Sequence, residues 1–176
     1  MEKERGVSYL IFCSDKSDYR NACLRNGRDY RLAYNKLKLL YDTAFKEFQK
    51  PMIQKNFQKA DPEDLSLAGP MVVSLALSIE LTLKSLLKYQ KVKFNNTHKI
   101  KDLFHLLDNR SQQSIRAGVE SRYDSEFVKE LNFENELENH NNIFVKLRYG
   151  HEKESISINI IFLEKFSDVL LNYILD

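Results

Sequence analysis

The chain has 176 residues, of which 43% are apolar and 30% are charged, so it is long enough to bury a core and has the composition of one folded domain. Only five glycines and three prolines are present, which leaves little material for the many tight turns of an all-β sandwich. The formal net charge of +2 is too small to indicate nucleic-acid binding by itself. The composition therefore favours an all-α domain.

The two cysteines and the N-terminus bear on where the protein works. Cys13 and Cys23 are ten residues apart, without a Cys-x-x-Cys pair or a Cys/His spacing typical of metal sites. The first five residues are largely charged, and the apolar run over residues 7–13 is too short to cross a bilayer. We therefore expect a cytoplasmic protein with free thiols, no cofactor and no metal site.

Residues 1–27 are predicted to form an N-terminal arm, with a short extended segment over residues 6–13 and a polar loop over residues 14–27. From Arg28, apolar residues recur at three- and four-residue steps, which predicts an amphipathic helix. This helix should end near Lys50, because a proline disfavours helical geometry in the residue before it. Its expected apolar face consists of Leu32, Leu37, Leu40, Tyr41, Ala44, Phe45 and Phe48.

Residues 70–90 are predicted to form the central helix of the domain. Nearly every position is apolar, and the small polar residues share one narrow strip of the helical wheel, so the segment is expected to be buried. Glu80 and Lys84 interrupt the apolar arc, which argues against a membrane span. The strip consists of Ser74, Ser78, Thr82, Ser85 and Lys88.

The second half of the chain shows further helical periodicity, so residues 28–176 are predicted to form one bundle of five to six helices. Thr97 is the expected N-cap of the first of these helices, and Gly150 the expected end of the third. His105 is expected at the surface, and the run of residues 140–142 on a solvated face or along a polar cleft. The predicted helices span residues 99–109, 111–119, 127–149 and 156–175.

Glu80 needs an explanation, because a carboxylate in an apolar arc is unfavourable unless it is paired. Lys84 follows at the favourable i,i+4 spacing, but an exposed pair of this kind contributes only about 0.3–0.5 kcal/mol. A further partner is therefore required. We predict a buried network in which Arg148 meets Glu80 and Glu152 meets Lys84.

Three segments, in this order and spacing, give the chain a resemblance to a known family. They are IELTLKSLL at residues 79–87, THKIKDLFHLL at residues 97–107 and FVKLRYGHE at residues 144–152. Together they resemble the HEPN family of small helical proteins, over about residues 28–175. The resemblance implies a helical bundle that forms a homodimer. Many members of that family are metal-independent ribonucleases or toxins of bacterial defence and toxin–antitoxin systems.

Catalytic HEPN proteins carry an arginine followed, after four to six residues, by a histidine. The resemblance implies that these side chains from two protomers meet across the dimer cleft, where histidine acts as acid or base and arginine stabilises the pentavalent phosphate. Here the nearest match is Arg148 and His151, with only two residues between them. This departure from the catalytic pattern favours a non-catalytic binding or regulatory module with a possible cognate protein partner. The polar core of the module consists of Glu80, Lys84, Tyr149 and Glu152. The alternative is a ribonuclease or toxin that uses Arg148 and His151.

A run of lysines between residues 84 and 101, with no acidic residue among them, lies beside Tyr89 and Phe94. Aromatic rings next to lysines commonly bind single-stranded RNA. Lysines at the C-terminal end of a helix are also common where nothing is bound, because they offset the helix dipole. Both interpretations are open, and the candidate RNA contacts are Lys88, Lys91, Lys93, Lys99 and Lys101.

Overall fold

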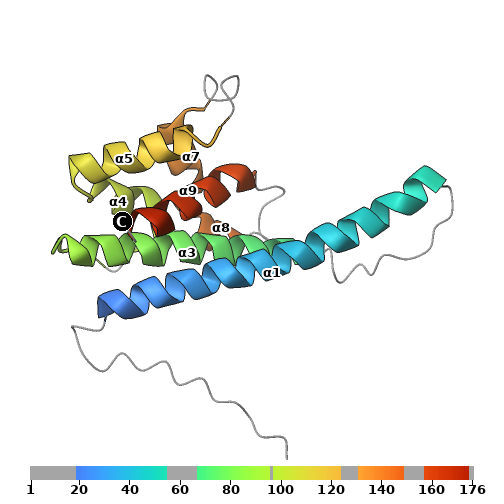
Figure 1. Ribbon diagram of the computed structural model, residues 1–176, viewed down its shortest axis with the longest axis horizontal. Helices are drawn as coiled ribbons and strands as arrows, with labels where there is room; N and C mark the ends of the chain where they lie inside the picture. The colour runs from blue at the N-terminus through green and yellow to red at the C-terminus, as the bar shows by residue number, and fades with distance from the viewer. Residues whose placement is uncertain (1–18, 55–66, 96, 124–130, 149–156, 175–176) are drawn as a thin grey trace, which may run out of the picture.

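The computed structural model describes residues 19–54, 67–95, 97–123, 131–148 and 157–174, which form seven helices and no strand (Figure 1). The predicted all-α class is therefore confirmed, whereas the predicted extended segment at residues 6–13 lies outside the described residues. The helices are α1 (Tyr19–Gln54), α3 (Ala68–Tyr89), α4 (Ile100–His105), α5 (Asn109–Glu120), α7 (Phe133–His140), α8 (Ile143–Arg148) and α9 (Ile160–Tyr173).

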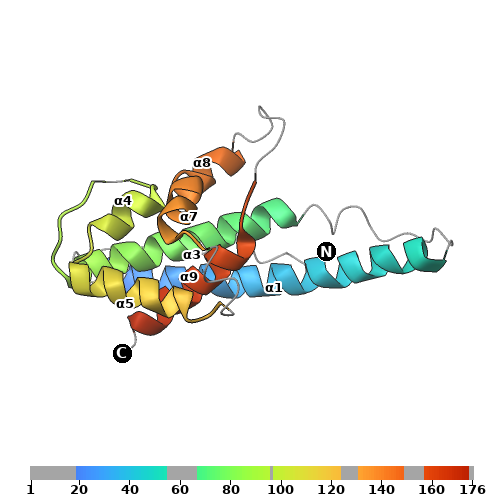
Figure 2. The same ribbon diagram turned by 90° about the horizontal axis from the view of Figure 1, so that it is seen from above.

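Helix α3 runs through the middle of the bundle, with α1 along one side and α4, α8 and α9 on its other sides (Figures 1 and 2). Fourteen of its 22 residues are buried, which confirms the predicted central helix. Among the described residues it is the one helix with the length and apolarity of a membrane span. Since 78% of its most apolar window is buried inside the protein, its place in the core accounts for that apolarity.

The strip of small polar residues on α3 is where α1 packs. A Cβ atom added to Gly27 of α1 would lie 2.8 Å from Thr82 Oγ1 and 3.3 Å from the carbonyl oxygen of Ser78. Near the other end of the contact, Ser85 Oγ donates a hydrogen bond to the Arg20 carbonyl at 3.2 Å. These contacts show that the two helices are antiparallel. Small side chains on α3, with a glycine opposite, allow the backbones to approach closely.

Both predicted ends of the first helix are wrong. Helix α1 begins at Tyr19 rather than Arg28, because the segment before residue 28 is packed on α3 and buries the Cys23 side chain. Burial stabilises this segment in spite of its polar composition. At the other end the helix continues through Pro51 to Gln54, since a proline removes one intrahelical hydrogen bond without necessarily ending the helix.

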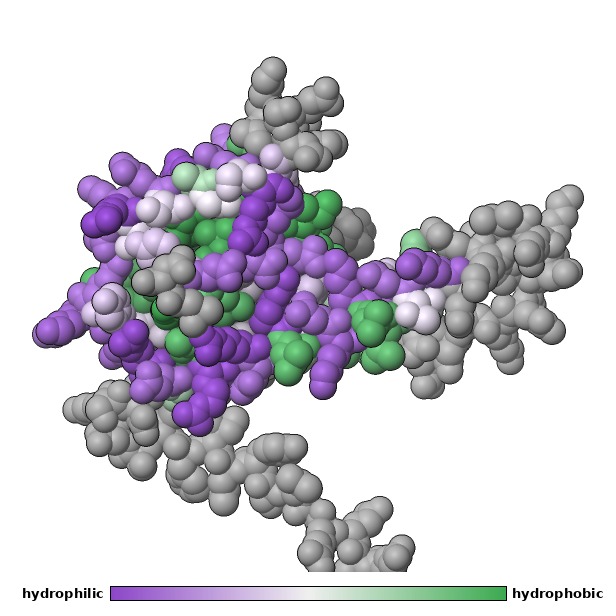
Figure 3. Space-filling model, in the orientation of Figure 1, coloured by the Kyte–Doolittle hydropathy of each residue, from purple (hydrophilic) through white to green (hydrophobic). Residues whose placement is uncertain are grey.

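The outer part of α1 runs past the start of α3 (Figure 1), and apolar side chains are exposed along it (Figure 3). The sequence predicted Leu32, Leu40 and Phe45 in the core, but their exposed fractions are 54%, 55% and 40%. Helical periodicity identified an apolar face correctly only where a partner helix covers it. Tyr34, which the predicted face omitted, is fully buried.

The predicted helix over residues 127–149 is wrong because it is interrupted: α7 ends at His140 and α8 begins at Ile143. The cause is Asn141, which is buried between the two helices. Its carbonyl oxygen accepts a hydrogen bond from the Ile100 amide at 3.2 Å, and its side-chain oxygen accepts one from the Lys101 amide at 2.9 Å. Asn141 thus caps the start of α4. The predicted N-cap, Thr97, instead accepts a hydrogen bond from the Lys99 amide.

Candidate functional site

The charged pair of the central helix is closed off from solvent. Lys84 Nζ donates a hydrogen bond to Glu80 Oε1 at 2.7 Å, and only 4% of each side chain is exposed. The i,i+4 spacing on α3 brings the two groups together. Burial makes the pairing obligatory, because either charge alone would lack solvation.

The further partner of Glu80 among the described residues is His98, from the loop before α4. The His98 ring donates from Nδ1 to the Glu80 carboxylate, at 3.0 Å from Oε1 and 3.1 Å from Oε2. The same ring stacks on Phe144 of α8, with ring centroids 5.7 Å apart. His98 therefore ties α3, the loop before α4 and α8 together. Unlike Glu80 it is open to solvent, with 51% of its side chain exposed.

The predicted partners of this pair fall outside the part of the chain that the structure describes. The backbone of α8 ends at Arg148, whose side chain is not among the described ones, and Tyr149, His151 and Glu152 follow it. The network of Arg148 with Glu80 and of Glu152 with Lys84 stays a prediction. So does the role of Arg148 and His151 in catalysis.

The five candidate RNA-contact lysines fall into two groups. Lys99 lies 3.8 Å from Asp102, and Lys101 donates to Glu138 at 2.7 Å, so both are paired with acidic side chains. The other three lie at the end of α3 and in the turn that follows it, where Lys91 adopts a positive φ of 56°. In this group the Lys88 ammonium lies over the Phe94 ring, 5.3 Å from its centroid. All three side chains are exposed: Lys88, Lys91 and Lys93.

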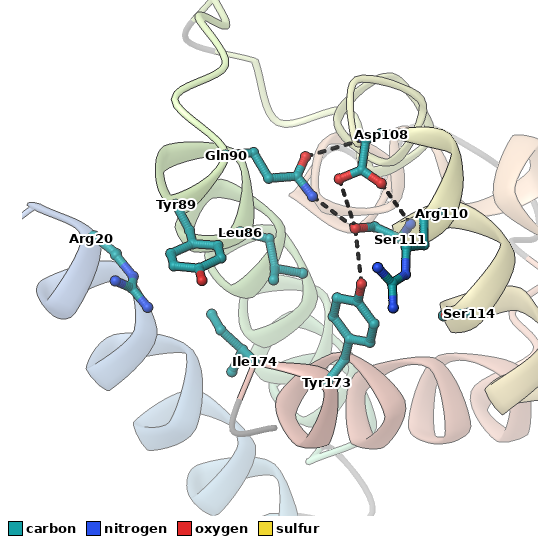
Figure 4. Close-up of a pocket in the computed structure, with 10 residues that line it drawn as sticks. All are labelled: Arg20, Leu86, Tyr89, Gln90, Asp108, Arg110, Ser111, Ser114, Tyr173 and Ile174. Atoms are coloured by element: carbon teal, nitrogen blue, oxygen red, sulfur yellow. Dashed lines mark hydrogen bonds between the residues drawn. The ribbon is translucent and has the colours of Figure 1, made fainter.

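An open pocket of about 510 Å³ lies at one end of the bundle (Figure 4). Helices α1 and α5 begin there, and α3 and α9 end there. Sequence reasoning missed it, because its walls come from four helices whose ends are far apart in the chain. The one local signal was Asp108, whose side chain caps α5 by accepting a hydrogen bond from the Ser111 amide at 2.8 Å.

A connected set of hydrogen bonds forms the polar wall of this pocket (Figure 4). The Ser111 hydroxyl donates to Asp108 Oδ2 at 3.0 Å, so its oxygen accepts from Gln90 Nε2 at 2.8 Å and from the Tyr173 hydroxyl at 3.0 Å. The Asp108 amide in turn donates to Gln90 Oε1 at 3.1 Å. The hydrogen bonds to Ser111 hold the pKa of Asp108 below its usual range. The wall is therefore arranged before any ligand arrives.

Two other polar groups that sequence reasoning missed or misplaced are structural. Tyr34 donates to Glu164 Oε1 at 2.5 Å and so joins α1 to α9; burial and the neighbouring carboxylate raise the pKa of Tyr34. His140 was expected near solvent, but it is buried. His140 Nδ1 donates to the Glu136 carbonyl at 2.7 Å, and Nε2 accepts from the Asn159 amide at 3.0 Å. Burial lowers the pKa of His140, so its ring is held neutral.

No protein-family model, no curated protein and no solved structure matches this chain. Within the described residues, no group of three or more histidine, cysteine, aspartate or glutamate side chains is placed to hold a metal ion. The two features of the protein that bear on function are the cluster around Glu80 and the end pocket.

Proposed function

We propose that this protein is a HEPN-like helical module that binds a ligand or a partner and regulates it, rather than an enzyme. It would act in the cytoplasm as a homodimer, in a bacterial defence or toxin–antitoxin system. The observation that supports this proposal most is the closure of the Glu80–Lys84 pair from solvent. A catalytic carboxylate or ammonium has to reach its substrate, whereas 96% of both the Glu80 and the Lys84 side chains is buried and the two groups are bonded to each other.

The role that this geometry supports is positional. Glu80 accepts hydrogen bonds from Lys84 and His98, and His98 stacks on Phe144, so three segments of the chain are fixed relative to one another. A rigid scaffold of this kind suits a module that presents a preformed site. The pocket of about 510 Å³ falls within the size range of small-molecule sites, roughly 300–1,000 Å³.

One observation favours the second candidate, a metal-independent ribonuclease. A half-exposed histidine whose Nδ1 is held by a buried carboxylate is the arrangement of a general base or acid. If the protein cleaves RNA, His98 is therefore a candidate beside Arg148 and His151. Its Nε2 has no partner among the described residues, which leaves it available to a substrate hydroxyl.

The test is incubation of the purified full chain with single-stranded and structured RNA in the presence of EDTA. The variants are His98→Ala, Arg148→Ala and His151→Ala. The matched control is His105→Ala, because His105 is also a half-exposed histidine bonded to a glutamate, Glu134. We expect no cleavage by the folded wild type. Cleavage that survives in His105→Ala and is lost in any of the other three variants would replace the module with the ribonuclease.

The proposed homodimer is tested separately, by measuring the mass of the purified protein in solution with light scattering. We expect twice the chain mass of 20.8 kDa. A monomer at all concentrations would remove the dimer from the proposal. It would also remove the ribonuclease alternative in which Arg148 and His151 act across a dimer cleft.

A further inference from the structure

The end pocket carries two arginines that the rest of the described structure leaves without acidic partners. Arg20 comes from the first turn of α1 and Arg110 from the first turn of α5, and the two lie on opposite sides of the pocket (Figure 4). Neither forms an ion pair with a described residue, although three other described arginine–carboxylate pairs do form. Asp108, the carboxylate that lines the pocket, accepts hydrogen bonds from the Ser111 amide and hydroxyl, and the Arg110 charge also acts on it.

Arg20 is the more unusual of the two. Its Nε atom is buried and has no hydrogen-bond partner in the described structure. A buried N–H without a partner is unfavourable, and more so when it belongs to a charged group. The Arg20 guanidinium lies over the Tyr89 ring, 4.5 Å from its centroid, which holds it at the pocket. Because Nε is shielded from solvent, a ligand in the pocket meets the rest of the Arg20 side chain, beside the Tyr89 ring.

The remaining surface of the pocket suits a flat ring. Tyr89 is 63% exposed, and Leu86 and Ile174 supply apolar surface beside it (Figure 4). Aromatic and guanidinium planes bind planar rings by stacking. The Tyr173 hydroxyl, which donates to Ser111, keeps its oxygen available as an acceptor.

The charges of the pocket favour an anion at the α5 side. Arg110 lies in the first turn of α5, where the positive end of the helix dipole adds to its charge. Helices α3 and α9 end at the same pocket and contribute the opposite sign. The two arginines outweigh the single carboxylate of Asp108, so the local formal charge is positive.

We propose that this pocket binds a planar ring that carries one phosphate or carboxylate group, a ligand of about the size of a nucleoside monophosphate. The ring lies against Tyr89 and Arg20, and the anionic group meets Arg110. This inference rests on the proposed function, because it names the ligand class of the binding module. The same chemistry can come from a free small molecule or from the phosphorylated end of an RNA strand.

The test is calorimetric titration of the full chain with four probes: adenosine monophosphate, adenosine, inorganic phosphate and indole-3-acetate. We expect one of the two ring-bearing anions to bind at least tenfold more tightly than adenosine or phosphate alone. A 5′-phosphorylated RNA oligonucleotide forms a further arm. Tighter binding of the oligonucleotide than of adenosine monophosphate assigns the site to an RNA end, and equal or weaker binding assigns it to a free ligand.

The variants are Arg110→Gln and Tyr89→Leu, each of which should weaken binding of the ring-bearing anion at least tenfold. The control is Arg25→Gln, which removes the same charge from an exposed position of α1 that does not line the pocket, and should change binding less than twofold. The inference is overturned if no ring-bearing anion binds, or if Arg110→Gln and Arg25→Gln weaken binding equally. RNA cleavage in EDTA would instead overturn the proposed function, so the two failures are distinguishable.

Discussion

The substitution Glu80→Gln tests the role of the buried ion pair most directly. It leaves the Lys84 ammonium in the core without a carboxylate, since 4% of the Lys84 side chain is exposed. Breaking a buried pair in this way costs about 3–5 kcal/mol of unfolding free energy. For a chain of this length, that corresponds to a fall of about 1–2 M in the urea midpoint.

The chain contains a matched control for this substitution. Lys101 Nζ and Glu138 Oε2 are also 2.7 Å apart, but 27% and 64% of these side chains are exposed. Glu138→Gln should therefore lower the stability far less than Glu80→Gln does, because water solvates the remaining charge. The assay is urea unfolding of both variants, followed by circular dichroism at one protein concentration. Equal losses within about 0.5 kcal/mol would refute burial as the source of the pair's importance.

A double variant separates the loss of the ion pair from the destabilisation caused by the unpaired charge that remains. In Glu80→Gln combined with Lys84→Met, no unpaired ammonium is left in the core. We expect this variant to be more stable than Glu80→Gln alone, since replacing both partners of a buried pair is often nearly neutral. A double variant that is less stable than the single one would show that Lys84 contributes chiefly through other contacts.

Three further predictions concern packing and protonation. Gly27→Ala should lower the melting temperature despite a gain of up to about 1 kcal/mol in helix propensity, because the new Cβ would lie 2.8 Å from a threonine hydroxyl of α3. Gly69→Ala is the control: no atom lies within 4 Å of its new Cβ, so this substitution should not lower the melting temperature. Burial lowers the pKa of His140 below its unfolded value of about 6.5, so the stability that His140 contributes should be complete above pH 6.5 and should be lost as the pH falls below it. Urea midpoints of wild type and His140→Gln across this pH range test the expectation, and parallel pH profiles would contradict it. Tyr34→Phe should cost about 1.5–3 kcal/mol in urea unfolding, because the phenol donates to the charged Glu164 carboxylate at 2.5 Å, and a cost below about 0.5 kcal/mol would contradict this.

The cluster around Glu80 shows why only part of it could be predicted from the sequence. The apolar arc of residues 70–90 made Glu80 anomalous, and the i,i+4 spacing indicated Lys84 as its neighbour, because both inferences need only the geometry of one helix. The contribution of His98 could not be found in this way. It comes from a loop 18 residues away, and only the turn that follows α3 brings its ring to Glu80.

The sequence by itself determined the all-α class and the buried central helix, because the spacing of apolar residues follows directly from helical geometry. Only the tertiary structure decided where helices begin and end. Asn141 interrupts a periodic segment to cap α4, and α1 extends back to Tyr19 because α3 covers that segment. The pocket around Arg20 and Arg110 likewise exists only where four helix ends meet. Contacts between distant segments carry much of the free energy of folding, and periodicity within a single segment does not record them.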